Sequence, residues 1–485
     1  MTQSSNPRGR LRALFSPRDM TKGAPWRRIL EFAFPMFVGN IAQQLYASAD
    51  SAIVGRYVGD NALASVGSTM AATNFLIALF IGISSGAGIV VSQAFGAKNR
   101  EKLSLAVGNV ITLTAISSLI ITVMAMLLSR PLLTLLNTPA VILEDAVLYL
   151  QIVFLGVIGI SYYNILSGVL RGLGDSFSAL GFLLLSTALN IALDLWFVVS
   201  FGWGVAGAAV ATVISQAISA ALCYLKLRRM GETFHLSRRT FRLDREITGE
   251  IVRLGMPAGI TQAIFSMAML VVQPLQNSFG EAFVATAIIA MRVDGFAMMP
   301  NFSFGMAMTT FTGQNIGAQR LDRAQKGALQ GTLLAVGVAV MMTSLVLVFG
   351  HQIMALFTKT EHIIQTGMGL IRILSVGFIA MAVMQSLSGV MRGAGDATTP
   401  MWISIFVSVI LRVPLSYLFV HLSKSPENPL GRPESLYFAM LATWLTGGAV
   451  NVLAYRFGSW RTKARERMRM YAGAAEKAAD APART

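Results

Sequence analysis

The chain has 485 residues, of which 54% are hydrophobic and only 13% are charged, and its mean hydropathy is +0.62. Soluble domains carry about 25% charged residues, so this composition excludes an ordinary soluble fold. The formal net charge of +16 would indicate nucleic-acid binding in a soluble protein. Here the basic residues gather in tails and connections between long apolar runs. The positive-inside rule of membrane proteins explains this pattern without a nucleic-acid partner.

Twelve apolar runs follow one another along the chain, and each is long enough to cross a membrane, because a spanning helix needs about 20 residues. The first six are 29–55, 62–95, 103–128, 145–170, 177–200 and 203–227. The second six are 250–279, 283–315, 325–349, 365–391, 398–422 and 435–457. The sequence therefore predicts an all-α integral membrane protein of twelve transmembrane helices.

Polar and basic segments divide these runs into parts. The predicted domains are a basic N-tail at 1–28, an N-lobe at 29–227, a linker at 228–249, a C-lobe at 250–457 and a C-tail at 458–485. Lysine and arginine are concentrated in both tails and in the linker, as in the cytoplasmic segments of membrane proteins. Both termini and the linker are therefore expected on the cytoplasmic side of a multi-pass protein.

The two lobes repeat one another. Three pairs of stretches share one offset of 221 residues: VGDNALA at 58–64 with FGEAFVA at 279–285, SQAFGAKNRE at 92–101 with GQNIGAQRLD at 313–322, and SGVLRGLGD at 167–175 with SGVMRGAGD at 388–396. Each repeat has an even number of helices, so both enter the membrane from the same side. They are expected to be related by a pseudo-two-fold axis along the membrane normal, with a substrate cavity between the lobes.

Three acids lie deep inside the predicted helices, at Asp50, Asp194 and Asp294. The run around Asp50 carries no other charged residue between Glu31 and Arg56. A charged side chain at membrane depth costs roughly 2.5–3.5 kcal/mol on insertion scales and normally faces a cavity or a partner. Each of the three acids is therefore a functional candidate.

Asp194 has the most polar surroundings of the three. Asn190 lies four residues earlier, on the same face of the helix, and Asn164 and Thr212 in flanking helices can converge on the same place. Carboxylate, amide and hydroxyl oxygens are hard ligands that suit Na⁺ or a proton held in a hydrogen-bond network. The alternative is that Asp194 and Asn190 only join neighbouring helices by hydrogen bonds.

Asp50 and Asp294 each have a competing structural explanation. Asp50 can pair with Arg56 near the outer end of the first helix. Asp294 has Arg292 two residues away, but residues two apart do not share a helix face, so an ion pair with Arg412 of another helix is the alternative there.

Prolines and methionines mark further candidates. Pro35 in the first helix and Pro257 in the seventh each remove a backbone hydrogen bond and are hinge candidates, although a static bend is the alternative. Met267, Met298 and Met306 belong to a methionine-rich region that can line an adaptable hydrophobic pocket, with ordinary packing as the alternative.

Motifs for other chemistry are missing from the sequence. It contains no Walker loop, no nucleotide-binding domain and no carboxylate cluster for Mg²⁺ and a diphosphate, and its four histidines lack metal-ligand spacing. No cofactor and no enzymatic activity are expected, and active transport would have to draw on an ion gradient.

The chain resembles the multidrug and toxic compound extrusion (MATE) family over nearly all of 29–457. The stretches that carry the resemblance are FPMFVGNIAQQLYASADSAIVGRYVGDNALASVG, SQAFGAKNRE, GVLRGLGDS, LNIALDLWFVVSFGWGVAGAAVATVISQ, GQNIGAQR and GVMRGAGDA. The resemblance implies two six-helix lobes around a V-shaped cleft. It also implies export of small organic cations through the lipid bilayer, driven by inward flow of H⁺ or Na⁺.

The family's site residues carry over to matching positions of this chain. Asp50 resembles the first-helix acid of the family, and Pro35 resembles its first-helix proline. The cation-site residues of the DinF-like branch match Asn164, Asn190, Asp194 and Thr212. The NorM-like branch carries acids in helices seven and ten, and this chain does not match them there. A C-lobe ion site is therefore expected only if Asp294 serves instead, and the coupling site is placed in the N-lobe.

The resulting hypothesis is a monomeric antiporter of the bacterial inner membrane that exchanges organic cations for H⁺ or Na⁺ by alternating access. If the ion is Na⁺, its expected ligands are Asp50, Asn190, Asp194 and Thr212. The alternative is a lipid-linked glycan flippase, which needs a basic cleft, whereas Arg292, Arg372 and Arg412 are the only cations within the predicted helices. A membrane-embedded enzyme is a third possibility, which the absence of a nucleophile constellation disfavours.

Overall fold

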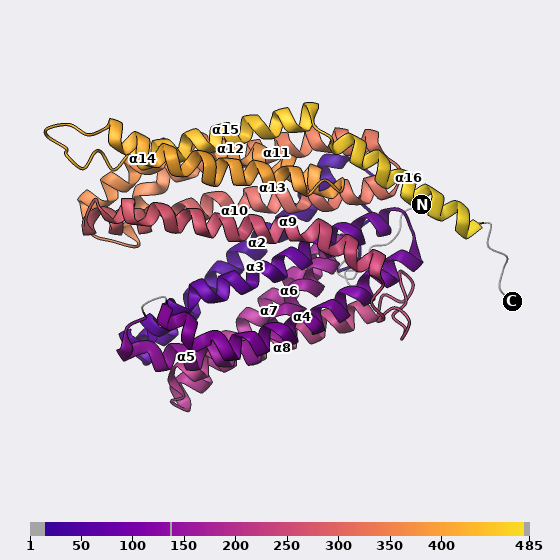
Figure 1. The fold of residues 1–485 in the computed structure, drawn as a ribbon, viewed down its shortest axis with the longest axis horizontal. Coiled ribbons are helices and arrows are strands. Elements are labelled where there is room, and N and C mark those ends of the chain that lie inside the picture. The colour runs from indigo at the N-terminus through magenta and orange to yellow at the C-terminus, as the bar shows by residue number, and fades with distance from the viewer. Residues whose placement is uncertain (1–14, 136–137, 480–485) are drawn as a thin grey trace, which may run out of the picture. The chain divides into compact units, whose positions relative to one another are not determined.

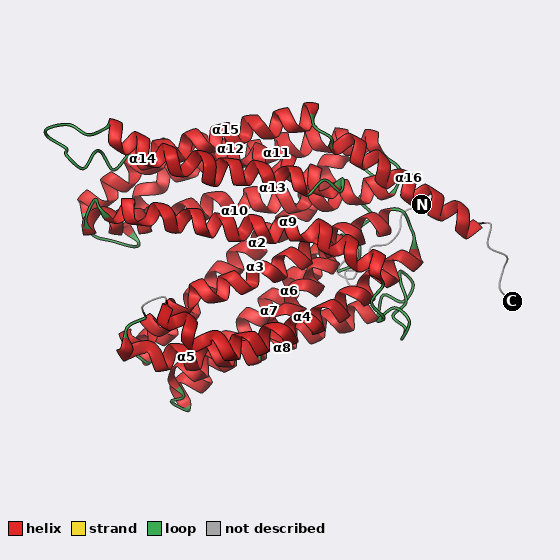
Figure 2. Cartoon of the chain, in the orientation of Figure 1, coloured by secondary structure: helices red, strands yellow, loops and turns green. Residues whose placement is uncertain are grey.

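The computed structural model describes residues 15–135 and 138–479, with regular structure that is helical throughout this part (Figures 1 and 2). The first half contains α2 (Pro25–Tyr57), α3 (Asp60–Gly96), α4 (Arg100–Leu135), α5 (Ala140–Leu155), α6 (Val157–Gly172), α7 (Ser176–Asp194), the π-helix η1 (Leu195–Ser200) and α8 (Gly204–Arg228). The second half contains α9 (Arg245–Asn277), α10 (Glu281–Gly317), α11 (Leu321–Ala355), α12 (Glu361–Gly393), α13 (Thr398–Ile405), the π-helix η2 (Phe406–Leu411), α14 (Arg412–Leu422), α15 (Ser435–Phe457) and α16 (Trp460–Ala479).

The predicted membrane architecture is confirmed. Within the described residues nine helical spans are long and apolar enough to cross a membrane, and α5 with α6, bent by 53°, adds a tenth. The helices α2 and α3, with 33 and 37 residues, account for the two remaining predicted runs. Each predicted run coincides with one helix or one broken helix, although α2 is not itself among the spans that meet the hydropathy criterion.

The repeated motifs build the same turns in both halves. Gly174 and Gly395 have positive φ values of 85° and 92°, at the same place in the two copies of the SGV motif. The next residue in each copy lies just before a helix. Asp175 is the N-cap of α7 and accepts from the Ser178 backbone N–H at 2.9 Å, and Asp396, two residues before α13, accepts from the Thr399 N–H at 3.2 Å. A carboxylate in this position satisfies an orphan backbone donor, so the repeat preserves helix starts.

The chain forms two compact units whose boundaries differ from the predicted lobes. Unit 1 comprises Met1–Asp19 and Val38–Gly259, and unit 2 comprises Met20–Phe37 and Ile260–Thr485. The boundaries therefore lie inside α2 and α9, whereas the sequence places the division in the polar linker. Pro35 and Pro257, the hinge candidates, each lie two residues before such a boundary.

Packing explains why α2 is divided. Ile29, Phe32 and Met36 are buried in a core cluster of unit 2 together with residues of α10 and α12. Val54, near the other end of the helix, is buried in a cluster of unit 1. A polar linker marks a break in hydropathy, but only burial decides which core a helix joins.

The predicted linker packs onto α4 in unit 1. The Asn109 amide donates to the Thr240 carbonyl at 3.3 Å, and its oxygen accepts from the Asp244 N–H at 2.6 Å. Lys102 and Glu250 form a buried ion pair at 2.8 Å. The predicted C-tail likewise begins as the docked helix α16, with Trp460 fully buried in unit 2. The linker and the part of the C-tail up to Ala479 therefore pack as parts of their units.

Candidate functional site

Two buried carboxyl groups meet in unit 1. Asp50 lies on α2 and is 8% exposed, and Asp194 is the last residue of α7 and is fully buried. The two carboxyl groups lie close enough to influence one another electrostatically. The structure thus brings together two acids that are far apart in the sequence.

Thr212 of α8 joins the two helices that carry these acids. Its hydroxyl oxygen accepts from the Tyr46 hydroxyl at 3.2 Å and lies 3.5 Å from the Asn190 amide nitrogen, the outer limit of a hydrogen bond. Tyr46 lies one turn before Asp50, and Asn190 lies one turn before Asp194. Residues four apart share a helix face, so α2 and α7 each present one polar residue and one acid toward α8.

The acid pair lacks a compensating positive charge among the described residues. No ion pair to a lysine, arginine or histidine involves Asp50 or Asp194 in this part of the chain. Asp50 Oδ1, both carboxyl oxygens of Asp194 and Asn190 Oδ1 are buried and accept no hydrogen bond from a donor there. Two buried carboxylates without a donor or counter-charge are strongly unfavourable, so this arrangement suits a small cation.

Sequence reasoning missed two tyrosines at this site. Tyr46 and Tyr149 of α5 both lie within electrostatic range of Asp50 and Asp194. The spacing of Tyr46 to Asp50 within YASAD was a usable signal, because it places both on one helix face. Tyr149 comes from a different helix, and no local pattern indicates its place.

The backbone also changes at this site. The π-helix η1 begins at Leu195, directly after Asp194. Its Phe197 stacks on Trp203, with ring centroids 5.1 Å apart, at the start of α8. Such π-helical turns are rare and occur frequently at functional sites.

Two expected contacts of this site are replaced by others. The Asn164 amide donates to the Ile160 carbonyl of its own helix at 2.8 Å, and no hydrogen bond joins it to the acid pair within the described residues. Arg56 forms no ion pair with Asp50 in this part of the chain, so the pairing considered for Asp50 is not present.

The third acid has different surroundings, in unit 2. Asp294 of α10 lies within electrostatic range of Arg412 of α14 and Tyr437 of α15. The Arg412 guanidinium also contacts the Met440 sulfur at 3.5 Å. Arg292 instead lies over the Phe357 ring, 5.6 Å from its centroid, so it is not the partner of Asp294.

The three methionine candidates differ in exposure. Met267 is 63% exposed, whereas Met298 is 5% exposed within a hydrophobic core of unit 2. Met306 is partly buried against another core of that unit. The burial of Met298 is explained by ordinary packing, the alternative that the sequence left open for all three.

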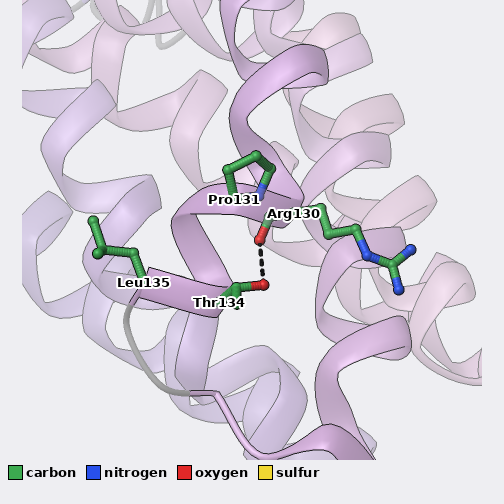
Figure 3. A pocket seen from close by; sticks show the side chains of 4 residues that line it. All are labelled: Arg130, Pro131, Thr134 and Leu135. Atoms are coloured by element: carbon green, nitrogen blue, oxygen red, sulfur yellow. Dashed lines mark hydrogen bonds between the residues drawn. The ribbon is translucent and has the colours of Figure 1, made fainter.

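Two pockets on the surface of the described residues are lined by side chains other than these acids. Figure 3 shows one at the end of α4, where Arg130, Pro131, Thr134 and Leu135 line it and the Thr134 hydroxyl donates to the Arg130 carbonyl at 2.9 Å. A second, apolar groove of about 520 Å³ in unit 2 is lined by Trp26 and residues of α11. Neither contains a candidate site residue.

A duplicated bundle of apolar helices with acidic residues buried among them is typical of membrane transporters. The MatE family model matches residues 35–196 and again 257–418, two copies displaced by 222 residues, which supports the internal repeat read from the sequence. The chain belongs to the MatE family of multidrug efflux transporters. Members of this family are transporters rather than enzymes.

Individual relatives agree with this assignment. The probable multidrug resistance protein YoeA of Bacillus subtilis is 30% identical over 411 residues, which cover 83% of this chain and 89% of YoeA. The probable multidrug resistance protein NorM of Thermotoga maritima is 26% identical over 451 residues, covering 91% and 95%. A crystal structure of MATE in the straight conformation is similar with a TM-score of 0.83 and 25% identity, covering 94% and 98%. A MOP superfamily transporter from Pyrococcus furiosus reaches 0.84 at 25% identity, covering 91% and 98%.

Proposed function

We propose that the protein is an antiporter that exports small organic cations across a bacterial inner membrane in exchange for H⁺ or Na⁺. The observation that carries this proposal is the uncompensated pair of Asp50 and Asp194 in unit 1. A buried pair of carboxyl groups needs positive charge, and either the coupling ion or a cationic substrate can supply it. If the coupling ion and the substrate compete for this one pair of acids, binding of one releases the other, which is a direct way to exchange them.

The roles of the neighbouring residues follow from their contacts. Thr212 orients Tyr46 and Asn190 beside the acids through its hydroxyl oxygen. If the coupling ion is Na⁺, the oxygens of Asp50, Asn190, Asp194 and Thr212 are its expected ligands. If it is H⁺, the two carboxyl groups share the proton and the Tyr46 hydroxyl lies near them.

Transport requires that the ion and the substrate prefer different conformations of the chain. A ligand shifts a conformational equilibrium only by its difference in affinity for the two states. Neutralisation of Asp50 and Asp194 by the ion must therefore weaken substrate binding in one of the two conformations. Pro35 and Pro257 are hinge candidates for this change, because each lies beside a point where a helix passes from one unit into the other. On the positive-inside rule we place both termini in the cytoplasm, and we expect a monomer to suffice.

Export of lipid-linked glycans is the less favoured function. The related Pyrococcus furiosus transporter is described as having reverse polarity of its binding pocket, which suggests a different function for that protein. An anionic diphosphate group would need basic residues at the site, and the acid pair of unit 1 has the opposite charge. Substrate candidates in unit 2 are Asp294 and the methionines with exposed surface, Met267 and Met306.

The decisive experiment is efflux of ethidium, a small organic cation, from proteoliposomes under an imposed pH gradient or an imposed Na⁺ gradient. We expect Asp194→Asn to reduce gradient-driven efflux to the rate of empty liposomes while the protein remains folded. Asp145→Asn, the same chemical change at an exposed position of α5, is the matched control and should transport normally. Full efflux by Asp194→Asn would rule out the proposed role, and the gradient that drives the native protein identifies the ion.

A further inference from the structure

The apolar groove of unit 2 runs along α11, a helix long and apolar enough to cross a membrane. It is lined by Trp26, at the start of α2, and by a stripe on α11 that begins at Gln330, includes Leu333 and Gly337 and ends at Met341. Leu333 and Met341 are 62% and 54% exposed. At 1.5 Å per residue the stripe is about 16 Å long, which is about half of the roughly 30 Å thickness of the hydrocarbon core. The groove therefore has the length of one leaflet.

A missing side chain at Gly337 contributes to this hollow. A Cβ atom added at Gly337 would meet no atom within 4 Å. Two other glycines of α11 differ, because a Cβ at Gly327 would collide with Phe311 and one at Gly331 with Met308. Glycine weakens a helix relative to alanine, so close packing explains Gly327 and Gly331. Packing among the described residues does not explain Gly337, which leaves open space on the surface of the helix.

The corresponding face of α4 in unit 1 is covered by the chain itself. The two helices begin 221 residues apart, the offset of the repeated motif that precedes them, so Leu333 corresponds to Thr112. The Thr112 hydroxyl donates to the Phe241 carbonyl at 2.7 Å, which places the linker across this face. Ile116 stands where α11 has Gly337. The duplicated fold thus covers this face in unit 1 and leaves it open in unit 2.

One end of the groove is polar and basic. Lys326 is exposed and lies one turn before Gln330 on the same face of α11, and it forms no ion pair among the described residues. Residues 25–31 and 321–327, the first two turns of α2 and α11, together hold four basic and two acidic residues. Trp26 is 47% exposed, and tryptophan is enriched where hydrocarbon meets lipid headgroups.

We propose that this groove binds one anionic phospholipid of the surrounding bilayer. An acyl chain lies along the stripe from Leu333 to Met341, and the headgroup phosphate lies at Lys326 and the Trp26 indole. The apolar wall suits a hydrocarbon chain, the length suits one leaflet, and the excess of basic residues at one end attracts an anionic headgroup. The bound lipid holds the start of α2 against α11, beside the hydrogen bond of 3.2 Å from the Trp26 N–H to Gln330. The inference does not depend on the ion or the substrate proposed above.

The test measures lipid binding to the full chain by native mass spectrometry from detergent. The probes are phosphatidylglycerol, which is anionic, and phosphatidylcholine with the same acyl chains, which is zwitterionic. We expect one phosphatidylglycerol to bind the native chain more tightly than any phosphatidylcholine. Gly337→Leu should weaken its binding about tenfold, because keeping two methylene groups out of the groove already accounts for such a loss. Lys326→Gln should weaken phosphatidylglycerol about fivefold and leave phosphatidylcholine unchanged.

The matched control is Gly369→Leu. Gly369 lies in α12, outside the groove, and a Cβ there also meets no atom within 4 Å. This variant should bind phosphatidylglycerol with the native affinity. Native affinity in Gly337→Leu, or an equal loss in Gly369→Leu, would overturn the proposal. If Gly337→Leu does not accumulate, the exposed change Lys326→Gln decides the question, and native affinity for phosphatidylglycerol there would refute the headgroup contact.

Two other occupants of the groove would give different results. If the native chain is a dimer that Gly337→Leu separates into monomers, the groove is an interface between two copies and the lipid assignment is wrong. If Gly337→Leu weakens both lipids equally and Lys326→Gln weakens neither, the groove accepts any acyl chain and the anionic headgroup is refuted. None of these measurements uses transport, so failure of the proposed antiport leaves the lipid site standing, and failure of the lipid site leaves the antiport standing.

Discussion

The buried acids of the two units differ in the charged groups that surround them. In unit 1, Asp50 and Asp194 face one another without a cation among the described residues. In unit 2, Asp294 has Arg412 within electrostatic range. A buried charge must be compensated, so the two units differ in whether a cation of the chain itself lies near the acid.

The backbone frame of the two halves is much more alike than their charges. Gly174 and Gly395 make the same positive-φ turn, and Asp175 and Asp396 cap the helix that follows. These turns lie at helix ends, where backbone donors need partners in both halves. Residues inside the helices are free of that requirement, so the duplicated halves can differ there in function.

The largest effect is expected at the acid pair. Asp50→Asn and Asp194→Asn should each abolish gradient-driven efflux, and the double variant should be no worse than either single variant, because residues that act as one unit are not additive. Efflux assays on the three variants in parallel measure this. Substantial efflux by either single variant would show that the two acids bind ions separately, and it would make unit 1 resemble a pair of independent sites.

The two capping acids offer a comparison of stability. Lys463 contacts Asp396 at 2.7 Å, whereas Lys226 is 3.9 Å from Asp175. Asp396→Asn should therefore cost about 2 kcal/mol of unfolding free energy, in the range of a hydrogen bond to a charged group. Asp175→Asn should cost less than about 1 kcal/mol.

A reason for the smaller cost is the burial of Asp175 itself. Burial raises the pKa of the Asp175 carboxyl, and the hydrogen bonds from Ser178 and the charge of Lys226 only oppose this rise. The neutral asparagine removes that desolvation cost and keeps one acceptor for the cap. Chemical denaturation in detergent measures both values, and a larger loss for Asp175→Asn than for Asp396→Asn would contradict the expected order.

A smaller effect on ion binding is expected when the Thr212 hydroxyl, which accepts from Tyr46 and Asn190, is removed. Thr212→Val removes the acceptor of Tyr46 and Asn190 while it preserves the side-chain shape. The loss of about 1–1.5 kcal/mol of hydrogen bonding should weaken ion binding about tenfold. Thr187→Val is the control, because its hydroxyl donates only to the Leu183 carbonyl of its own helix. Equal ion affinity in Thr212→Val and the native protein would mean that Thr212 does not support the site.

The smallest effect is expected at Asn164. The family resemblance assigns it to the cation site, but its amide donates to its own helix at Ile160. Asn164→Ala should therefore change ion affinity by less than about threefold, which corresponds to well under 1.4 kcal/mol. A loss as large as that of Thr212→Val in the same ion titration would show that Asn164 joins the acids in another conformation.

The sequence by itself determined the class of the protein and the course of its helices. Hydropathy and proline or glycine turns are local properties, so the runs from 29–55 to 435–457 coincide with the helices of the structure. The motif repeat was also visible, because the same turns need the same residues. The four-residue spacing of Asn190 and Asp194 correctly predicted a shared face, since helix geometry alone sets it.

Only the tertiary structure decided which hydrophobic core each helix packs into and which charged side chains lie near one another. It divided α2 and α9 between two units, brought Tyr149 near the acid pair and placed Arg412, rather than Arg292, within electrostatic range of Asp294. It also left Asn164 bound to its own helix. The physical reason is that burial and charge compensation depend on which distant side chains meet, and no local pattern in a uniformly apolar helix records its neighbours.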